Sequence, residues 1–107
     1  MNTNKKIITT LALSALVVNV VGATSNNTIV GTDNTISANS TSSMVSGFQN
    51  HINANNAFAF GTDNTVTGEN GFAGGNNATA AGRNSFAFGS HAESLVEYTI
   101  AMGNQSR

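Results

Sequence analysis

The chain has 107 residues, enough for one domain, and it contains no Cys, Pro or Trp. Only 8% of the residues are charged and the formal net charge is −1, which excludes a basic nucleic-acid-binding surface. The absence of Cys excludes thiol redox chemistry and zinc–thiolate sites. Two His and five carboxylates, scattered over the chain, leave little from which to build an active site. We therefore predict a structural or binding protein that is not an enzyme, with no cofactor, no bound metal, no small-molecule substrate and no nucleic-acid partner.

Residues 1–23 have the pattern of a secretory signal peptide, which we expect to be helical. Lys5 and Lys6 form a positive start, residues 7–21 are mostly apolar, and small residues lead to a cleavage site after Ala23. The apolar run of about 15 residues is shorter than the roughly 20 that span a bilayer, so a membrane anchor or a buried helix is the weaker interpretation. We expect export to a bacterial surface or into the medium. The expected mature domain, 24–107, contains two Arg and five carboxylates, which give it a net charge of −3.

The mature chain is a repeat with a period of 14 residues. Gly47, Gly61, Gly75, Gly89 and Gly103 are spaced by 14, and Gly68 and Gly82 lie halfway between their neighbours, which divides each unit into two heptads. The sequence Gly-Thr-Asp-Asn-Thr occurs at both 31–35 and 61–65, and the two residues Asn39-Ser40 form an insertion. A disordered chain would not keep this register over about 80 residues.

Each heptad fits a short strand followed by a corner. Gly at the last position and the β-branched, Asn and small residues elsewhere are poor for a helix interior, whereas the third to sixth residues suit an extended strand. Gly, and the Asn or Asp two positions later, tolerate the positive φ of a turn. We therefore predict an all-β parallel β-solenoid with two short strands in each 14-residue coil. Its expected corner residues are Gly47, Gly61, Gly68, Gly75, Gly82, Gly89, Gly103, Asp33 and Asp63.

Side-chain alternation divides the strand positions into an interior and two outer faces. The fifth heptad position is small and nearly always apolar, so we expect it to fill a narrow interior. The residues concerned are Val45, Ile52, Ala59, Val66, Ala73, Ala80, Ala87 and Ala101.

The fourth and sixth positions point outward, and the two halves of the coil differ there. One half is polar, with His51, Thr65 and Thr79 among its residues. The other half forms a contiguous apolar patch, which monomers rarely expose, so we expect the fold to be an obligate homo-oligomer; packing against another domain of a longer chain is the alternative. The expected interface residues are Met44, Phe58, Phe60, Phe72, Phe86, Phe88, Ile100 and Met102.

Two units resemble the head repeat of YadA-like trimeric autotransporter adhesins: 56–61 (NAFAFG) and 84–89 (NSFAFG). This family has a haemagglutinin- and invasin-type 14-residue repeat with the pattern small–x–Ala–x–Gly. The segment 97–103 (EYTIAMG) looks like a further copy. The resemblance covers roughly residues 25–103. It implies a left-handed parallel β-roll, a homotrimer, a place on the bacterial outer membrane surface, and cell adhesion in virulence, through attachment to a host matrix protein, a glycan or another cell. Full-length relatives also have a neck, a stalk and a membrane barrel, which residues 104–107 do not contain.

Other functions fit the pattern less well. The period is wrong for calcium-binding nonapeptide repeats, so we expect Asp33 and Asp63 to cap the corners as Asx turns. His51 and His91 lie 40 residues apart without a Cys or paired carboxylates nearby, so we expect neither to act in catalysis or to bind a metal. We expect Arg83, Glu93 and Glu97 to be solvated. We predict the head module of an adhesin that binds through its polar outer face and corners; the alternative is a free secreted β-solenoid of the ice-binding or biofilm-matrix type.

Overall fold

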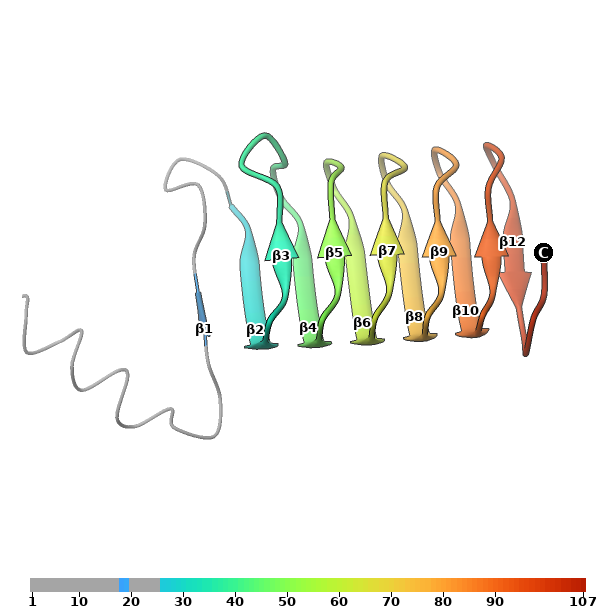
Figure 1. The fold of residues 1–107 in the computed structure, drawn as a ribbon. Coiled ribbons are helices and arrows are strands. Elements are labelled where there is room, and N and C mark those ends of the chain that lie inside the picture. The colour runs from blue at the N-terminus through green and yellow to red at the C-terminus, as the bar shows by residue number, and fades with distance from the viewer. Residues whose placement is uncertain (1–17, 20–25) are drawn as a thin grey trace, which may run out of the picture.

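The computed structural model describes Val18–Asn19 and residues 26–107 (Figure 1). Val18–Asn19 form strand β1, which pairs antiparallel with the strand that follows it. The remainder of the expected helical signal peptide at 1–23 lies outside the described residues, and at β1 the chain is a strand rather than a helix.

The rest of the chain alternates longer and shorter strands, and the described residues contain no helix. The longer strands are β2 (Thr28–Thr32), β4 (Met44–Phe48), β6 (Phe58–Thr62), β8 (Phe72–Asn76), β10 (Phe86–Ser90) and β12 (Ile100–Met102). The shorter strands are β3 (Thr35–Ile36), β5 (His51–Ile52), β7 (Thr65–Val66), β9 (Thr79–Ala80) and β11 (Glu93–Ser94).

The two strands of a coil therefore differ in length, although the heptad pattern predicts equal ones. Except for β12, the longer strands continue through the seventh heptad position. Gly47 at this position packs so closely on the next coil that an added Cβ would lie 2.0 Å from the carbonyl oxygen of Gly61. Glycine lets the backbones of successive coils stay paired through this corner. In the other half the strand pairing ends earlier, at Val66 and Ala80, although Gly68 and Gly82 occupy the equivalent position and also lie close to the next coil.

The strands form two parallel sheets whose register repeats every 14 residues. One sheet has the order β2-β4-β6-β8-β10-β12, with β1 antiparallel at its edge, and the other has the order β3-β5-β7-β9-β11. Phe58 pairs with Phe72, Phe72 with Phe86, and Phe86 with Ile100. The predicted parallel β-solenoid of 14-residue coils is confirmed.

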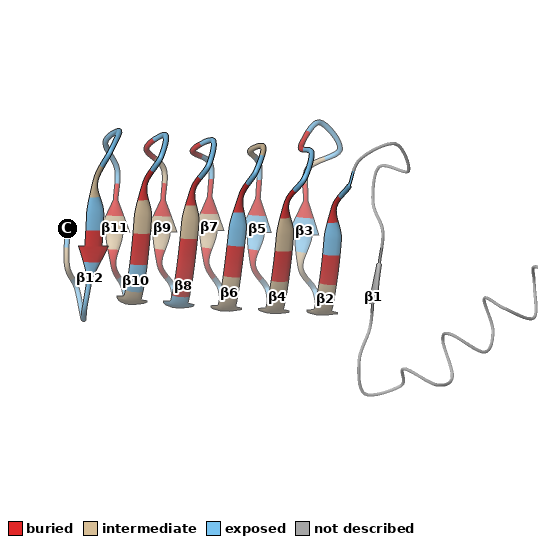
Figure 2. Cartoon of the chain, turned by 180° about the vertical axis from the view of Figure 1, so that it is seen from behind, coloured by how far each residue is buried: buried red, intermediate tan, exposed pale blue. Residues whose placement is uncertain are grey.

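The winding of the roll can be followed in Figures 1 and 2. In Figure 1 the longer strands run downward behind and the shorter strands run upward in front, while the chain advances from left to right, so the coil is left-handed. Figure 2 shows a buried band across the strands. Its side chains become smaller along the chain, from Ile29 and Ile36 at the N-terminal end to Ala87 and Ala101 at the C-terminal end.

The insertion Asn39-Ser40 changes the register at one place without breaking the stack. Thr28 pairs with Met44, an offset of 16 instead of 14, and the loop between β3 and β4 is visibly wider than the equivalent loops (Figure 1). The Ser40 N–H donates to the Ser37 carbonyl at 2.9 Å, and the Ser40 carbonyl accepts from the side chain of Asn27 at 2.7 Å. These bonds let the extra residues leave the roll and return within one corner.

Candidate functional site

The eight residues predicted to form an interface lie on the outer face of the longer-strand sheet, and we call them the apolar ladder. The ladder has two columns in the parallel register, one at the fourth and one at the sixth heptad position. The first column contains Met44, Phe58, Phe72, Phe86 and Ile100, and the second contains Phe60, Phe88 and Met102.

The five Phe rings of the ladder form one continuous cluster around Phe72. Its ring lies 4.7 Å from that of Phe86, with 8° between the planes, and 5.8 Å from that of Phe60. Both separations fall within the range preferred by aromatic pairs. Gly74 takes the sixth position of β8, where an added Cβ would lie 2.9 Å from a ring atom of Phe88. The missing side chain thus makes room for the Phe88 ring.

The apolar ladder remains substantially exposed in the single chain. Phe58 is 40% exposed, Phe88 47%, Ile100 72% and Met102 63%, and the other four residues are partly buried. Stacking within one chain therefore covers the rings only in part. An apolar surface of this continuity is typical of an interaction site.

The shorter-strand sheet presents a polar outer face. Thr35, His51, Thr65, Thr79 and Glu93 follow one another at the fourth heptad position. The chemistry changes from coil to coil, so no regular column of one residue type extends along this face.

The charged residues form two ion pairs near the C-terminal end of the roll. Arg83 lies 3.3 Å from a carboxylate oxygen of Glu97, with both side chains about half exposed, and Arg107 lies 3.5 Å from Glu93. The prediction that Arg83 and both glutamates are solvated is therefore incomplete, because residues 14 apart lie next to each other in successive coils. Exposed pairs of this kind contribute little to stability.

The residues expected in the interior are enclosed between the two sheets. Each is at most 3% exposed, and most have no exposed surface. They are Val45, Ile52, Ala59, Val66, Ala73, Ala80, Ala87 and Ala101. Ser94 replaces the apolar residue in the last complete coil, and its hydroxyl donates to the Thr99 carbonyl at 2.8 Å.

The corners depend on a left-handed residue at the second position of each heptad from Thr32 onward. These residues have φ between 54° and 61° although none is glycine. Most of the side chains concerned are Asn, Asp or His, which tolerate this conformation better than other non-glycine residues. They are Asp33, Ser42, Gln49, Asn56, Asp63, Asn70, Asn77, Asn84, His91, Tyr98 and Gln105.

The predicted corner glycines are of two kinds. Gly47, Gly61, Gly75, Gly89 and Gly103 have φ between 113° and 139°. Gly68 and Gly82 lie at corners without adopting positive φ. They are required by close approach instead, since an added Cβ on either would lie 2.0 Å from a carbonyl oxygen of the next coil.

A ladder of asparagine side chains, buried at Asn50 and Asn64 and partly buried at Asn34, caps the corner that follows the longer strands, and the sequence reasoning missed it. The side-chain oxygen of Asn34 accepts from the backbone N–H of Asn50 at 3.0 Å, and that of Asn50 accepts from Asn64 at 2.9 Å. The side-chain nitrogens of Asn50 and Asn64 donate to the oxygen of the amide before them in the ladder. Their spacing, 16 residues across the insertion and then 14, is the signal that could have revealed the ladder.

The same contacts correct the role given to Asp33 and Asp63. Both have exposed side chains, and neither makes a side-chain hydrogen bond within the part of the chain that the structure describes. The left-handed backbone at these positions turns the next residue inward, so Asn34 and Asn64 cap the corner.

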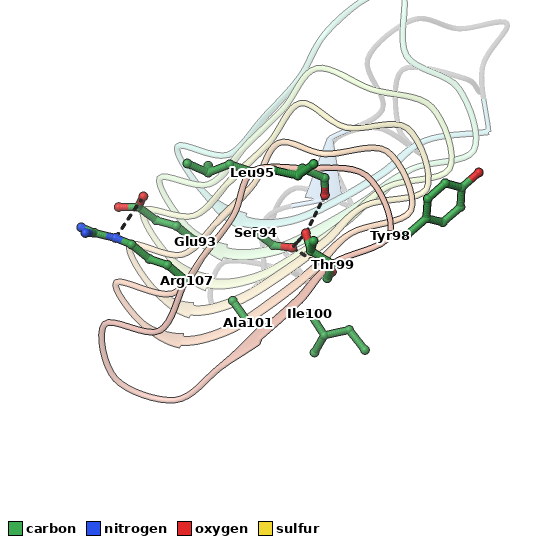
Figure 3. Close-up of a pocket in the computed structure, with 9 residues that line it drawn as sticks. Glu93, Ser94, Leu95, Tyr98, Thr99, Ile100, Ala101 and Arg107 are labelled. Atoms are coloured by element: carbon green, nitrogen blue, oxygen red, sulfur yellow. Dashed lines mark hydrogen bonds and ion pairs between the residues drawn. The ribbon is translucent and has the colours of Figure 1, made fainter.

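The C-terminal end of the roll is open and apolar. A hollow of about 500 Å³ lies beneath the last coil, lined by Leu95, Tyr98 and Ile100 among others. Figure 3 shows that Tyr98 and Ile100 point away from the roll, while Ser94 and Thr99 face each other across it. Leu95 is 54% exposed and Tyr98 72%.

The described residues contain no cluster of three or more His, Cys, Asp or Glu that could hold a metal ion. His51 lies on the polar face, whereas His91 lies at a corner with its Nδ1 3.0 Å from the Ser90 hydroxyl. In the same part of the chain no helix is long and apolar enough to cross a membrane.

Comparison with known proteins connects this geometry to one family. Two overlapping copies of the YadA head domain repeat match residues 53–78 and 67–92. No curated protein and no solved structure gives a significant match. The matched residues include β6 to β10 and all five Phe of the apolar ladder. Residues 53–92 are therefore YadA-like head repeats, in the form of a parallel β-roll.

Proposed function

We propose that the chain is an exported head module of a trimeric autotransporter adhesin, and that three copies associate through the apolar ladder. The observation that carries the proposal is the coincidence of YadA head repeats at 53–92 with a continuous, exposed Phe cluster on one face. The opposite face and the corners are polar and would stay accessible in such a trimer. They are the surfaces proposed to attach to a host matrix protein, a glycan or another cell.

Burial of the apolar ladder would contribute favourable free energy to association. A fully buried Phe, Ile or Met side chain contributes about 1.5–3 kcal/mol. Phe58, Phe88, Ile100 and Met102 still expose between 40% and 72% of their surface. Covering these exposed parts contributes on the order of 5 kcal/mol for each chain. The small Ala side chains of the interior contribute less free energy of burial, so we expect an obligate oligomer.

The oligomeric state tests the role of the ladder. Light scattering coupled to size-exclusion chromatography should give three times the monomer mass for the purified chain. Replacing Phe58, Phe60, Phe86 and Phe88 together by Ser should abolish the trimer, whereas Thr65→Ser on the polar face should leave it intact. A folded, monodisperse monomer of the unaltered chain would refute the ladder as an assembly surface.

Attachment is tested separately. The chain is displayed through a carrier anchor on a non-adherent bacterium, and cell retention is counted on surfaces coated with matrix protein, with glycan or with a second cell layer. Retention above that of the carrier alone on at least one surface is expected. Equal retention on all of them would reject the adhesive role, whatever the oligomeric state.

Export is tested through the proposed signal peptide. The mass of the mature chain recovered from outside the cytoplasm should correspond to cleavage after Ala23. A fusion of residues 1–23 to a reporter phosphatase, which is active only after export, should show activity, and a Lys5/Lys6→Glu version should lose most of it. An inactive fusion with normal expression would contradict the export assignment.

A further inference from the structure

A small polar hollow lies where the insertion widens the roll. Its volume is about 270 Å³, and it is lined by Asn39, Asn53, Asn55, Thr67 and Glu69 among others. Asn39 comes from the insertion, and the remaining four come from the corners of the next two coils. Asn39 and the neighbouring Ser40, which also lines the hollow, lie in the loop between β3 and β4. The volume is close to the lower limit of roughly 300 Å³ for small-molecule sites, which suits a ligand of one ring.

The hollow presents polar side chains that have no other partner. Among the described residues, the side chains of Asn39, Asn53, Thr67 and Glu69 make no hydrogen bond or ion pair. The Asn55 side chain is held in place, since its oxygen accepts from the backbone N–H of Thr41 at 2.9 Å. Its NH₂ group is left as a donor. The site thus combines free amide donors and acceptors, one hydroxyl and one carboxylate.

The backbone around the hollow is already paired with neighbouring coils. The Asn53 N–H donates to the Val66 carbonyl at 2.9 Å, and the Asn70 N–H donates to the Asn55 carbonyl at 3.0 Å. A peptide could therefore not be recognised here by adding a strand to a sheet edge. Recognition must come from the side chains.

We infer that this hollow binds a neutral carbohydrate unit. Neighbouring sugar hydroxyls each donate and accept, which matches amides that do both, and a carboxylate accepts strongly from two of them. Glu69 disfavours an anionic ligand, and the neighbouring Arg83 is already paired with Glu97. With one carboxylate and no His or Cys, the set is too poor for a divalent cation.

This inference rests on the proposed adhesive function, for which it names the class of ligand. Asn53 and Thr67 occupy the sixth heptad position of the shorter-strand half, away from the apolar ladder. A trimer formed through the ladder would leave the hollow open. Sugar binding and cell attachment can still fail independently: binding without attachment would reject only the adhesive role, and attachment without binding would reject only the site inferred here.

The test is a titration of the purified chain with neutral hexoses and N-acetylhexosamines, followed by the NMR shifts of backbone amides. For at least one sugar we expect shifts confined to residues around 39, 53–55 and 67–69, with a dissociation constant on the order of millimolar, as befits a ligand of this size. Glu69→Gln or Asn53→Ala should weaken binding at least about tenfold, because each leaves the sugar hydroxyls one strong partner short. The spectra also report whether each variant is folded.

Glu97→Gln is the matched control, because Glu97 lies in the same corner column two coils away and outside the hollow. Its binding should equal that of the unaltered chain. Three results would overturn the inference: no shift with any neutral sugar, equal weakening by Glu69→Gln and Glu97→Gln, or shifts that occur only with acidic sugars or with peptides.

Discussion

Replacing Asn64 by Ala removes a fully buried side chain from the asparagine ladder. The Asn64 side-chain oxygen accepts from the backbone N–H of Ala78 at 2.8 Å. Its nitrogen donates to the side chain of Asn50 at 2.9 Å and to the carbonyls of Phe60 and Gly75 at 2.7 and 3.0 Å. Asn64 and Ala78 have no exposed surface, so water cannot readily replace the lost bonds.

The magnitude follows from the groups that lose their partners. A buried N–H without an acceptor, here that of Ala78, costs about 1–3 kcal/mol. Each remaining hydrogen bond contributes about 1 kcal/mol net, and the two carbonyls are only partly buried. We therefore expect a loss of about 2–4 kcal/mol in the free energy of unfolding, which lowers the Tm of a chain of this size by roughly 10–20 °C.

Thermal unfolding followed by circular dichroism measures this loss. All variants are compared at one protein concentration, because association shifts the apparent Tm. Asn53→Ala is the matched control: it truncates the same side chain where it is exposed and unbonded, and its effect should stay within about 0.5 kcal/mol. If the two variants unfold at the same temperature, the ladder does not stabilise the corner in the way argued.

Three further substitutions examine other parts of the roll in the same assay. Ala78→Asn extends the asparagine ladder by one rung toward Ala92 and should raise stability by about 1 kcal/mol; a lower Tm would show that this corner has no room for an amide. Gly61→Ala places a Cβ 2.1 Å from the Gly75 carbonyl oxygen at a φ of 115°. The free energy of unfolding should therefore fall by at least about 2 kcal/mol. A neutral result would contradict the close packing of the glycine column. Arg83→Ala removes a half-exposed ion pair and should change stability by less than about 1 kcal/mol; a larger loss would indicate that the pair is shielded in the assembled protein.

The coil could be predicted from the sequence because it depends only on how residues are spaced along the chain. Spacing of the glycines by 14 predicts the register that pairs Phe58 with Phe72, and alternation along a strand predicts that Ala59 points inward and Phe60 outward. Both inferences need only the period and the two-residue repeat of an extended chain. They apply wherever the backbone is a strand.

At the corners the same reasoning fails, because alternation does not hold through a left-handed residue. In the pair Asp63-Asn64 either side chain suits a turn, and only the backbone geometry shows that Asp63 is exposed while Asn64 is buried. Phe48 was likewise left out of the apolar ladder by its position, although it is 42% exposed. The insertion could be located from the register, but the hollow beside it depends on side chains from three coils.

The 14-residue register that the coils share after the insertion has a consequence for how such a protein can change its dimensions. Each coil contacts the one before and the one after it, as in other solenoids, so adding or removing a whole unit leaves every remaining junction of the same type. One unit changes the length of the roll by about 4.8 Å, the spacing of paired strands. The reach of the module is thus adjustable in uniform steps, whereas any insertion that is not a multiple of 14 must leave the roll as a local loop, as Asn39-Ser40 does.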